Sequence, residues 1–307
     1  MNRDDYLAFQ QRIFDLYIEH PEVIKMWNLF DERRRIKKKS DKTPQSIFIM
    51  GKSRVGKTQM MKRYAQSSVK YTEYSNDGTE IDIIPVAYID CPAPFTIAAL
   101  YSQIIQQGLG AKLMGAKKID DLKTRAYRLL KEQKVELLII DELNFMLSGR
   151  YVKPRDAMEQ LKDITNKSGV IVACVGTPDI EELRKLNEQY VGRYPAITIP
   201  WFKEFDQSFV NLLQQIEEQL DPPIPLGFSD TNSTMPELIH HLCGGLIGWL
   251  EPMIYETFKL VGALNEDFDD YSLLRNIDGS VLLQARKNVI GELSEEEINK
   301  FLERGDR

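Results

Sequence analysis

The chain has 307 residues, of which 43% are hydrophobic and 28% charged, and its net charge is −6 at pH 7. This composition fits one large or two smaller globular domains, and an acidic chain contacts nucleic acid only through a local basic patch. Three widely separated cysteines without a CxxC pair argue against a disulfide framework or a zinc site, so we expect a reducing, cytoplasmic location.

Residues 1–45 are predicted to form a helical N-terminal adaptor. Apolar residues recur at helical spacing over residues 4–30, with a break at Pro21. The start of the chain is too polar for a signal peptide, and no apolar run reaches the roughly 18 residues of a membrane span, so we expect no membrane partner. The basic run RRRIKKK (residues 33–39) either clamps DNA or ends a solvated helix, and the sequence alone leaves both interpretations open.

Residues 46–205 alternate apolar strands with helices. The predicted strands are 46–50, 81–90, 135–142, 169–177 and 196–200, and the predicted helices are 59–67, 95–107, 119–133, 154–167 and 179–189. Continuous apolar strands separated by helices indicate a parallel sheet with helices on both faces, which is an α/β fold.

The strand pattern stops after the core. Helical spacing over 206–220, 234–243 and 245–264 predicts a small all-helical lid at residues 206–264. The acidic stretch that follows is expected to begin a C-terminal linker and tail, residues 265–307, which could form two short helices.

The segment GKSRVGKT matches the phosphate-binding pattern GxxxxGK[ST] between a predicted strand and a predicted helix. Backbone N–H groups of such a loop face the phosphates, and the following helix adds the positive end of its dipole. Lys57 is expected to reach the β- and γ-phosphates and Thr58 to ligate Mg²⁺. The nucleotide-binding residues are therefore expected to be Gly51, Lys52, Ser53, Arg54, Val55, Gly56, Lys57 and Thr58.

The segment LLIIDE (residues 137–142) supplies the second half of the site. A buried strand ending in Asp141 places a carboxylate where Mg²⁺ lies, and Glu142 can polarise the attacking water. The sequence thus predicts Mg²⁺-dependent hydrolysis with Thr58 and Asp141 as metal ligands. The nearest string to a GTPase base-reading motif, NKSG, lacks the aspartate, so ATP is the expected nucleotide.

Two further residues are candidates for contact with the γ-phosphate. Thr177 ends the strand of VACVGTPD, where ATPases with an inserted strand carry a sensor of this phosphate. Arg193 in YVGRYP precedes a strand and could reach a neighbouring subunit's nucleotide as an arginine finger. A surface role for Arg193 remains open because Arg184 is a competing candidate.

These motifs and their order resemble an AAA+ ATPase, and within that class the TnsC/TniB transposition regulators. The supporting strings are GKSRVGKT, VELLIIDE, GTPDIEEL and, in the lid, CGGLIGWLEPMIYET, and the resemblance covers roughly residues 25–264. It implies an ATP-dependent ring or filament on duplex DNA that marks a target and recruits a transposase. It also implies a partner of the TniQ type, hydrolysis that resets the complex, and no cutting of DNA by this subunit.

The lid departs from a common AAA+ pattern. Many lids carry a GxxR arginine that contacts the γ-phosphate, whereas the comparable stretch here, residues 245–249, has none. The family that the chain resembles tends to lack it too. The departure implies weak lid-driven hydrolysis and a larger role for the neighbour's Arg193.

A filament on DNA needs basic residues that neutralise phosphates without reading bases. The resemblance points to the region between the second strand and LLIIDE, where the candidates are Lys112, Lys117, Lys118, Lys123 and Arg125. Scattered lysines of this kind also form ordinary solvated helix faces, so this alternative stays open.

Three other functions compete with a transposition regulator. A helicase loader or replication initiator would be expected to carry an appended DNA-binding domain or a lid arginine. A signalling ATPase would need an effector or repeat domain, for which 307 residues leave no room. A metabolic phosphotransferase would need acid and base groups beyond the nucleotide site, and the three histidines form no such group. The loader or initiator is the main alternative.

Overall fold

The computed structural model describes residues 3–17, 21–39, 44–74, 77–113, 115 and 118–292. The chain divides into two compact units. Unit 1 groups Met1–Pro21, Arg54–Gly56 and Pro200–Arg307, and unit 2 groups Glu22–Ser53 and Lys57–Ile199. These bounds differ from the four-part division suggested by the sequence, because α1 and the described residues from 200 onward belong to one unit.

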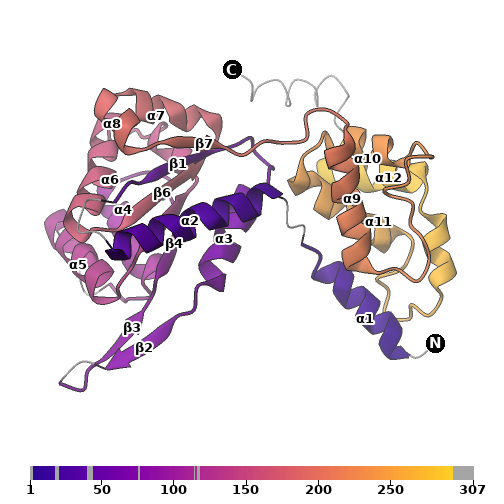
Figure 1. Ribbon diagram of the computed structural model, residues 1–307, viewed down its shortest axis with the longest axis horizontal. Helices are drawn as coiled ribbons and strands as arrows, with labels where there is room; N and C mark the ends of the chain where they lie inside the picture. The colour runs from indigo at the N-terminus through magenta and orange to yellow at the C-terminus, as the bar shows by residue number, and fades with distance from the viewer. Residues whose placement is uncertain are drawn as a thin grey trace. The chain divides into compact units, whose positions relative to one another are not determined.

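Unit 2 is built around a five-stranded parallel sheet in the order β4-β5-β6-β1-β7 (Figure 1). The strands are β1 (Ile47–Met50), β4 (Val86–Asp90), β5 (Leu137–Asp141), β6 (Ile171–Gly176) and β7 (Ala196–Thr198). The central strands β5 and β6 are buried along their whole length, as the continuous apolar runs predict. All carboxyl ends of a parallel sheet meet at one edge, and the functional motifs follow these ends.

Helices cover both faces of this sheet, which confirms the predicted fold class. Leu138 and Ile140 of β5 join the core formed with α4 (Ile97–Gln103), α5 (Ile119–Glu132) and α6 (Pro154–Ser168). The alternate side chains of β5 point to the other face, where α3 (Lys57–Ser67) contacts β4 and β5.

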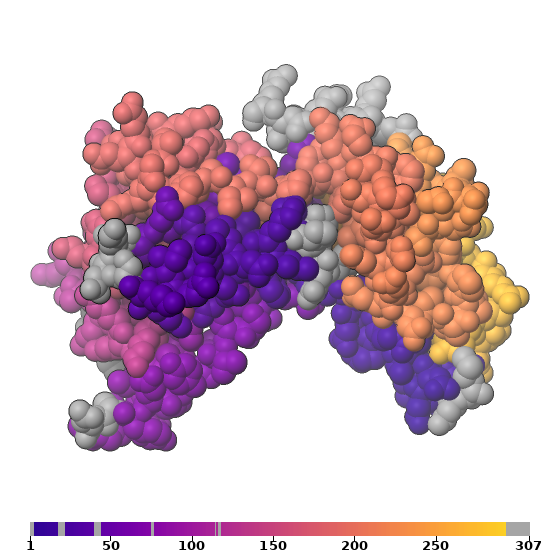
Figure 2. Space-filling view, viewed as in Figure 1, coloured from indigo at the N-terminus to yellow at the C-terminus, as the bar shows by residue number. Residues whose placement is uncertain are grey.

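The predicted strand 81–90 is two strands. Its first half, β3 (Glu80–Ile83), pairs antiparallel with β2 (Tyr71–Tyr74), which the sequence did not predict. Pro85 has no N–H group and interrupts the run before β4. The β2–β3 hairpin projects from the body of unit 2 at the lower left of Figure 2, and most of its residues are exposed.

Two predicted helices are also interrupted. The helix expected at 95–107 is α4 followed by a wider π-helical turn, η1 (Ile104–Gly108). The helix expected at 179–189 is a short turn, η3 (Pro178–Ile180), then α7 (Glu181–Lys185) and α8 (Glu188–Arg193). Asn187 caps α8 by accepting the N–H of Gln189 at 2.9 Å, which starts a new helix at that point.

The two N-terminal helices belong to different units. Helix α2 (Pro21–Lys39) lies across unit 2 (Figure 1), where Phe30 packs on Tyr64 of α3 with ring centroids 4.9 Å apart. Helix α1 (Arg3–Phe14) belongs to unit 1, and its buried Gln10 donates to the carbonyls of Ala263 and Asn265 at 3.0 and 2.8 Å. The predicted N-terminal adaptor is thus shared between the units.

Unit 1 is helical, as predicted for the lid. Its elements after α1 are α9 (Gln207–Leu220), α10 (Met235–Cys243), α11 (Ile247–Leu260), η4 (Tyr271–Asn276) and α12 (Gly279–Ile290). The expected linker and tail contain η4 and α12, and Leu274, Leu282 and Ala285 are buried in the same core as α9 to α11. This part of the predicted tail is therefore a folded portion of unit 1, and residues 293–307 lie outside the described residues.

No helix in the described part of the chain is long and apolar enough to cross a membrane.

Candidate nucleotide-binding site

The phosphate-binding loop joins β1 to α3. Its lysine is almost fully buried, and the Lys57 ammonium donates to the carbonyls of Gly51 and Lys52, both at 2.7 Å. Burial lowers the pKa of Lys57 from its ordinary value, while the negative charges of Asp141 and Glu142 act in the opposite direction. The ammonium is thus held by the carbonyls of the loop itself, close enough to both predicted carboxylates for their charges to act on it.

The backbone of the loop turns sharply before α3. Ser53 and Arg54 form a turn. Arg54 has a φ of 68° and Gly56 a φ of 96°, both in the left-handed region. Helix α3 then begins at Lys57, so the loop leads directly into a helix N-terminus, where backbone N–H groups and the helix dipole favour a phosphate chain.

Asp141 ends β5 and is fully buried. One carboxylate oxygen accepts the Tyr88 hydroxyl at 3.0 Å, and the other accepts the N–H of Glu142 at 2.8 Å. The same hydroxyl lies 2.8 Å from Asp90, so its single proton is shared between the two carboxylates. Asp90 lies opposite Asp141 in the register of β4 and β5. These bonds fix the orientation of the carboxylate and leave lone pairs for a metal ion or its water ligands.

Glu142 is the next residue and adopts a left-handed backbone with φ 55°. The Asn144 amide donates to Glu142 Oε2 at 3.2 Å, and the Asn144 carbonyl oxygen accepts the N–H of Thr177 at 3.5 Å. The Thr177 hydroxyl donates to Asp179 at 3.2 Å. Asn144 therefore links the predicted catalytic glutamate to the predicted sensor at the end of β6.

These residues fit a nucleotide with a hard divalent cation. The described residues contain no group of three or more His, Cys, Asp and Glu side chains that could hold a metal by themselves. Mg²⁺ is usually bound by one or two protein oxygens together with phosphates, and Thr58 and Asp141 supply oxygens of this kind.

The two competing arginines have different surroundings. Arg184 makes a bidentate pair with Glu181, at 2.8 and 2.6 Å, and this pair raises the pKa of Arg184 above its ordinary value. Arg193 ends α8 and donates through one nitrogen to Asn166 at 2.9 Å. Its Nη1 is buried and has no hydrogen-bond partner among the described residues. Arg184 is thus held by an acidic partner, whereas Arg193 has no ion pair among the described residues.

Two glycines of CGGLIG lie against backbone atoms within unit 1. A Cβ on Gly245 would lie 1.8 Å from the carbonyl oxygen of Phe202, and Gly245 has a φ of 66°. A Cβ on Gly248 would lie 2.7 Å from the carbonyl oxygen of Arg54, to which Gly248 donates its N–H at 2.7 Å. The glycine pattern that the resemblance singled out therefore serves close backbone contacts.

The structure describes four of the five predicted DNA-contacting residues, and Lys117 lies outside the described residues. Lys112 and Lys118 are exposed, and Arg125 donates to the carbonyl of Lys112 at 2.6 Å. The Lys123 ammonium lies 5.8 Å from the Tyr101 ring centroid. The loop before α5 and the start of α5 thus carry Lys112, Lys118 and Arg125 together.

Most basic side chains of the run in α2 bond to other residues of unit 2. Arg34 and Lys38 form ion pairs with Glu136, at 2.8 and 2.7 Å. Arg33 donates to the carbonyls of Gln45 and Ser46, and Lys37 donates to that of Val135. Four of the six basic side chains thus have intrachain partners, which favours a structural role over a DNA clamp.

Sequence reasoning missed Asn144, Tyr88 and Asp90. Asn144 follows the acidic pair by two residues, and Asp90 ends a predicted strand. Both positions could therefore have been predicted from the sequence to lie near the site. The role of Tyr88 depends on the pairing of β4 with β5, which no local pattern reveals.

Comparison with known proteins supports the resemblance stated from the motifs. A family model described as "Bacterial TniB protein" matches residues 11–204. No curated protein sequence matches the chain.

Solved structures share the fold at low sequence identity. The ORC2 protein of Aeropyrum pernix in ADPNP–ADP complexes matches with a TM-score of 0.59 and 15% identity, covering 94% of this chain and 74% of that one. Cdc6p of Pyrobaculum aerophilum matches with a TM-score of 0.57 and 13% identity, covering 94% and 73%. Drosophila ORC bound to DNA matches with a TM-score of 0.53 and 15% identity, covering 95% and 67%. The chain therefore has the AAA+ fold.

Proposed function

Because the chain belongs to the TniB family, we propose that it is an ATP-dependent regulator of DNA transposition. In this proposal it binds and hydrolyses ATP with Mg²⁺, assembles with further copies of itself on duplex DNA, and recruits a transposase to the marked site. A target-selection protein of the TniQ type is its other expected partner, and hydrolysis resets the complex. The protein acts in the cytoplasm.

The observation that carries the proposal is the set of Lys57, Asp141 and Glu142 in unit 2. The negative charges of both carboxylates act on the buried ammonium of Lys57. Asp141 ends β5, and Glu142 is the residue that follows the strand. In the proposed site the N–H groups of the loop and Lys57 bind the phosphates, and Thr58 and Asp141 hold the cation. When bound, Mg²⁺ neutralises charge on the phosphates.

Glu142 then acts on the attacking water. The Asn144 amide holds the carboxylate at 3.2 Å, and Glu142 accepts a proton from the water as it attacks the γ-phosphorus. In this proposal Thr177, whose backbone N–H donates to the same asparagine, responds to the presence of the γ-phosphate. Arg193 of a neighbouring copy supplies positive charge to the transition state, so hydrolysis depends on assembly.

Contact with duplex DNA is assigned to the loop before α5 and its first turns. The exposed Lys112 and Lys118 and the loop-bound Arg125 supply charges that neutralise phosphates without reading bases. Lys117 and Lys123 complete the proposed set.

Electron microscopy of the full chain with duplex DNA and a non-hydrolysable ATP analogue tests the proposal. Rings or filaments that need both ligands are expected. Monomers on DNA under these conditions would overturn it.

A replication initiator or helicase loader is the second candidate, since the fold is shared with ORC and Cdc6 proteins. The two are distinguished by partner. A transposition regulator binds its transposase in an ATP-dependent pull-down, whereas a loader binds a replicative helicase.

A further inference from the structure

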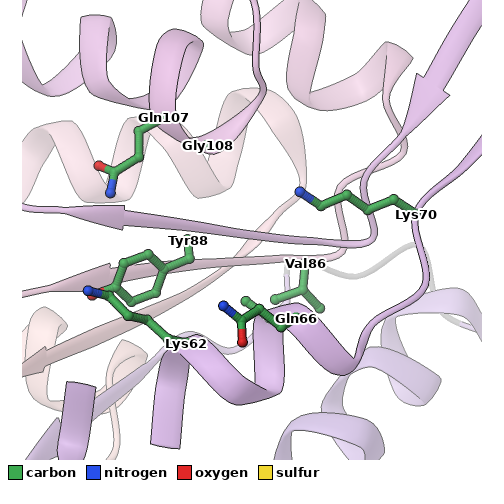
Figure 3. Close-up of a pocket in the computed structure, with 8 residues that line it drawn as sticks. Lys62, Gln66, Lys70, Val86, Tyr88, Gln107 and Gly108 are labelled. Atoms are coloured by element: carbon green, nitrogen blue, oxygen red, sulfur yellow. The ribbon is translucent and has the colours of Figure 1, made fainter. Parts of the chain in front are cut away.

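A cavity of about 280 Å³, lined by both polar and apolar residues, lies in unit 2 between α3, β4 and η1 (Figure 3). Lys62, Ala65 and Gln66 line it from one face of α3, since residues three and four apart are neighbours on a helix. The remaining lining residues are Lys70 from the segment before β2, Val86 and Tyr88 from one face of β4, and Gln107 and Gly108 from η1. The cavity is thus separate from the loop that carries GKSRVGKT.

The lining carries two positive charges and no carboxylate. Among the described residues, neither Lys62 nor Lys70 forms an ion pair with an acidic side chain, although other lysines of unit 2 do. The Lys62 ammonium lies 5.4 Å from the Tyr88 ring centroid. In Figure 3 the Lys70 side chain extends over the space beside Val86, and the Gln66 amide lies beside the same space.

The two carboxylates near this cavity are already bound by other donors. Asp90 accepts from the Tyr88 hydroxyl at 2.8 Å and from Gln107 Nε2 at 2.7 Å. Asp141 accepts from the same hydroxyl and from a backbone N–H. These acids therefore bond to neutral donors, and the two ammonium groups keep donors available for an incoming anion.

We propose that this cavity binds a phosphate group, in a site distinct from the nucleotide site. Two ammonium groups and the Gln66 amide supply donors that suit an oxyanion with several acceptor oxygens. Its source is a free polyphosphate or the backbone of a nucleic acid. Tyr88 lines the cavity and bonds to Asp141, so an anion bound here lies one side chain away from the predicted Mg²⁺ ligand.

The test uses calorimetric titration of the full chain, saturated with ADP, with inorganic pyrophosphate. Binding is expected, and Lys62→Ala/Lys70→Ala should weaken it by about a hundredfold, because removing each of the two charged hydrogen bonds costs close to tenfold. Lys62→Arg/Lys70→Arg should retain binding. The matched control Lys167→Ala changes an exposed lysine of α6 and should have no effect.

A second variant separates this site from the nucleotide site. Lys57→Ala removes the phosphate contact of the loop, and pyrophosphate should still bind to that variant with unchanged affinity. If the wild-type chain does not bind ATP, the proposed function is refuted, but the binding of pyrophosphate to this cavity is not. If Lys62→Ala/Lys70→Ala unfolds, as judged by circular dichroism, the Gln pair at the same positions replaces it.

Competition with a short DNA duplex identifies the source of the phosphate. If the duplex displaces pyrophosphate and binds more weakly to the double variant, the ligand is a nucleic-acid backbone. If the duplex does not displace pyrophosphate and binds equally well to the wild type and the double variant, the ligand is a free polyphosphate. Absence of pyrophosphate binding, loss of it in Lys57→Ala, or equal binding by the wild type and the double alanine variant would overturn the proposal.

Discussion

The side-chain amide of Asn144 donates a hydrogen bond of 3.2 Å to the carboxylate of Glu142. Because this bond orients the proposed general base, Asn144→Ala should lower the turnover of ATP by about ten- to a hundredfold, as expected when a catalytic group loses its positioning partner. The affinity for ATP should change little, since Asn144 has no predicted contact with the phosphates. Steady-state ATPase assays and nucleotide titrations measure the two effects.

The control for this variant is Asn211→Ala, which changes an exposed asparagine on α9 in unit 1. Asn144→Asp offers a finer test because it keeps the shape and adds a negative charge beside the glutamate. Because it also removes the amide donor, it should lower turnover at least as much as Asn144→Ala. Unchanged turnover in both variants would remove Asn144 from a positioning role.

Replacing Glu142 itself should separate binding from hydrolysis. Glu142→Gln keeps the size of the side chain and its contact with Asn144 but removes the base, so turnover should fall by about a hundredfold or more. ATP binding should persist, and assemblies on DNA should last longer because they cannot reset. Turnover equal to that of the wild type would exclude Glu142 as the catalytic base.

Arg193→Ala should depress turnover without preventing nucleotide binding. An arginine finger contributes about a thousandfold or more to phosphoryl transfer, and Arg193 forms no ion pair among the described residues that would hold it in place. Arg184→Ala is the matched control. Because the Arg184 guanidinium is hydrogen-bonded to Glu181, this variant should change turnover little.

A mixing experiment tests whether this arginine acts on a neighbouring copy. Lys57→Ala is expected to lose nucleotide binding but to keep its finger, whereas Arg193→Ala keeps the nucleotide site. Equal mixtures of these two inactive variants should recover part of the activity at concentrations that support assembly. Recovery should vanish on dilution, and its absence at every concentration would contradict action between subunits.

Local sequence patterns predicted those parts of the site that lie within one segment. GKSRVGKT and LLIIDE each combine a buried strand with the residues that follow it, so the places of Lys57 and Asp141 follow from the sequence alone. The parallel sheet could also be predicted from the sequence, because buried apolar runs alternate with helices. Pro85 shows the limit of this reasoning. The sequence pattern predicts one strand over residues 81–90, but the structure has two: β3 pairs with β2 in a hairpin, and β4 pairs with β5 in the sheet.

Features that depend on distant partners could not be predicted in this way. Helix α1 joins unit 1 because Gln10 and Phe9 meet residues about 250 positions away. The basic run of α2 looked available for DNA because Glu136, which pairs with Arg34 and Lys38, lies about 100 positions further on. Tyr88 likewise gains its role only through strand pairing.

The basic residues before α5 lead to a prediction about salt dependence. Lys112→Ala/Lys118→Ala should weaken binding to duplex DNA, and it should reduce the slope of log affinity against log salt concentration by about 0.9 for each phosphate that is no longer neutralised. The contrasting variant Arg34→Ala should lower stability, because it breaks the pair with Glu136, and should leave the slope unchanged. Fluorescence anisotropy at several salt concentrations measures the slope, and equal slopes in wild type and double variant would exclude these lysines.

Gly245 provides a test of the packing in unit 1. Gly245→Ala places a Cβ 1.8 Å from the Phe202 carbonyl oxygen in a backbone with φ 66°, so the Phe202–Gly245 contact must open. We expect a loss of about 3 kcal/mol in the free energy of unfolding of unit 1, from overpacking together with backbone strain.

Gly192→Ala is the control, because no atom lies within 4 Å of its added Cβ and the residue is in a helix. It should change stability by less than about 1 kcal/mol, in the stabilising direction. Urea titrations followed by tryptophan fluorescence compare the two, and similar midpoints would show that the close approach of Gly245 to Phe202 is not required for stability.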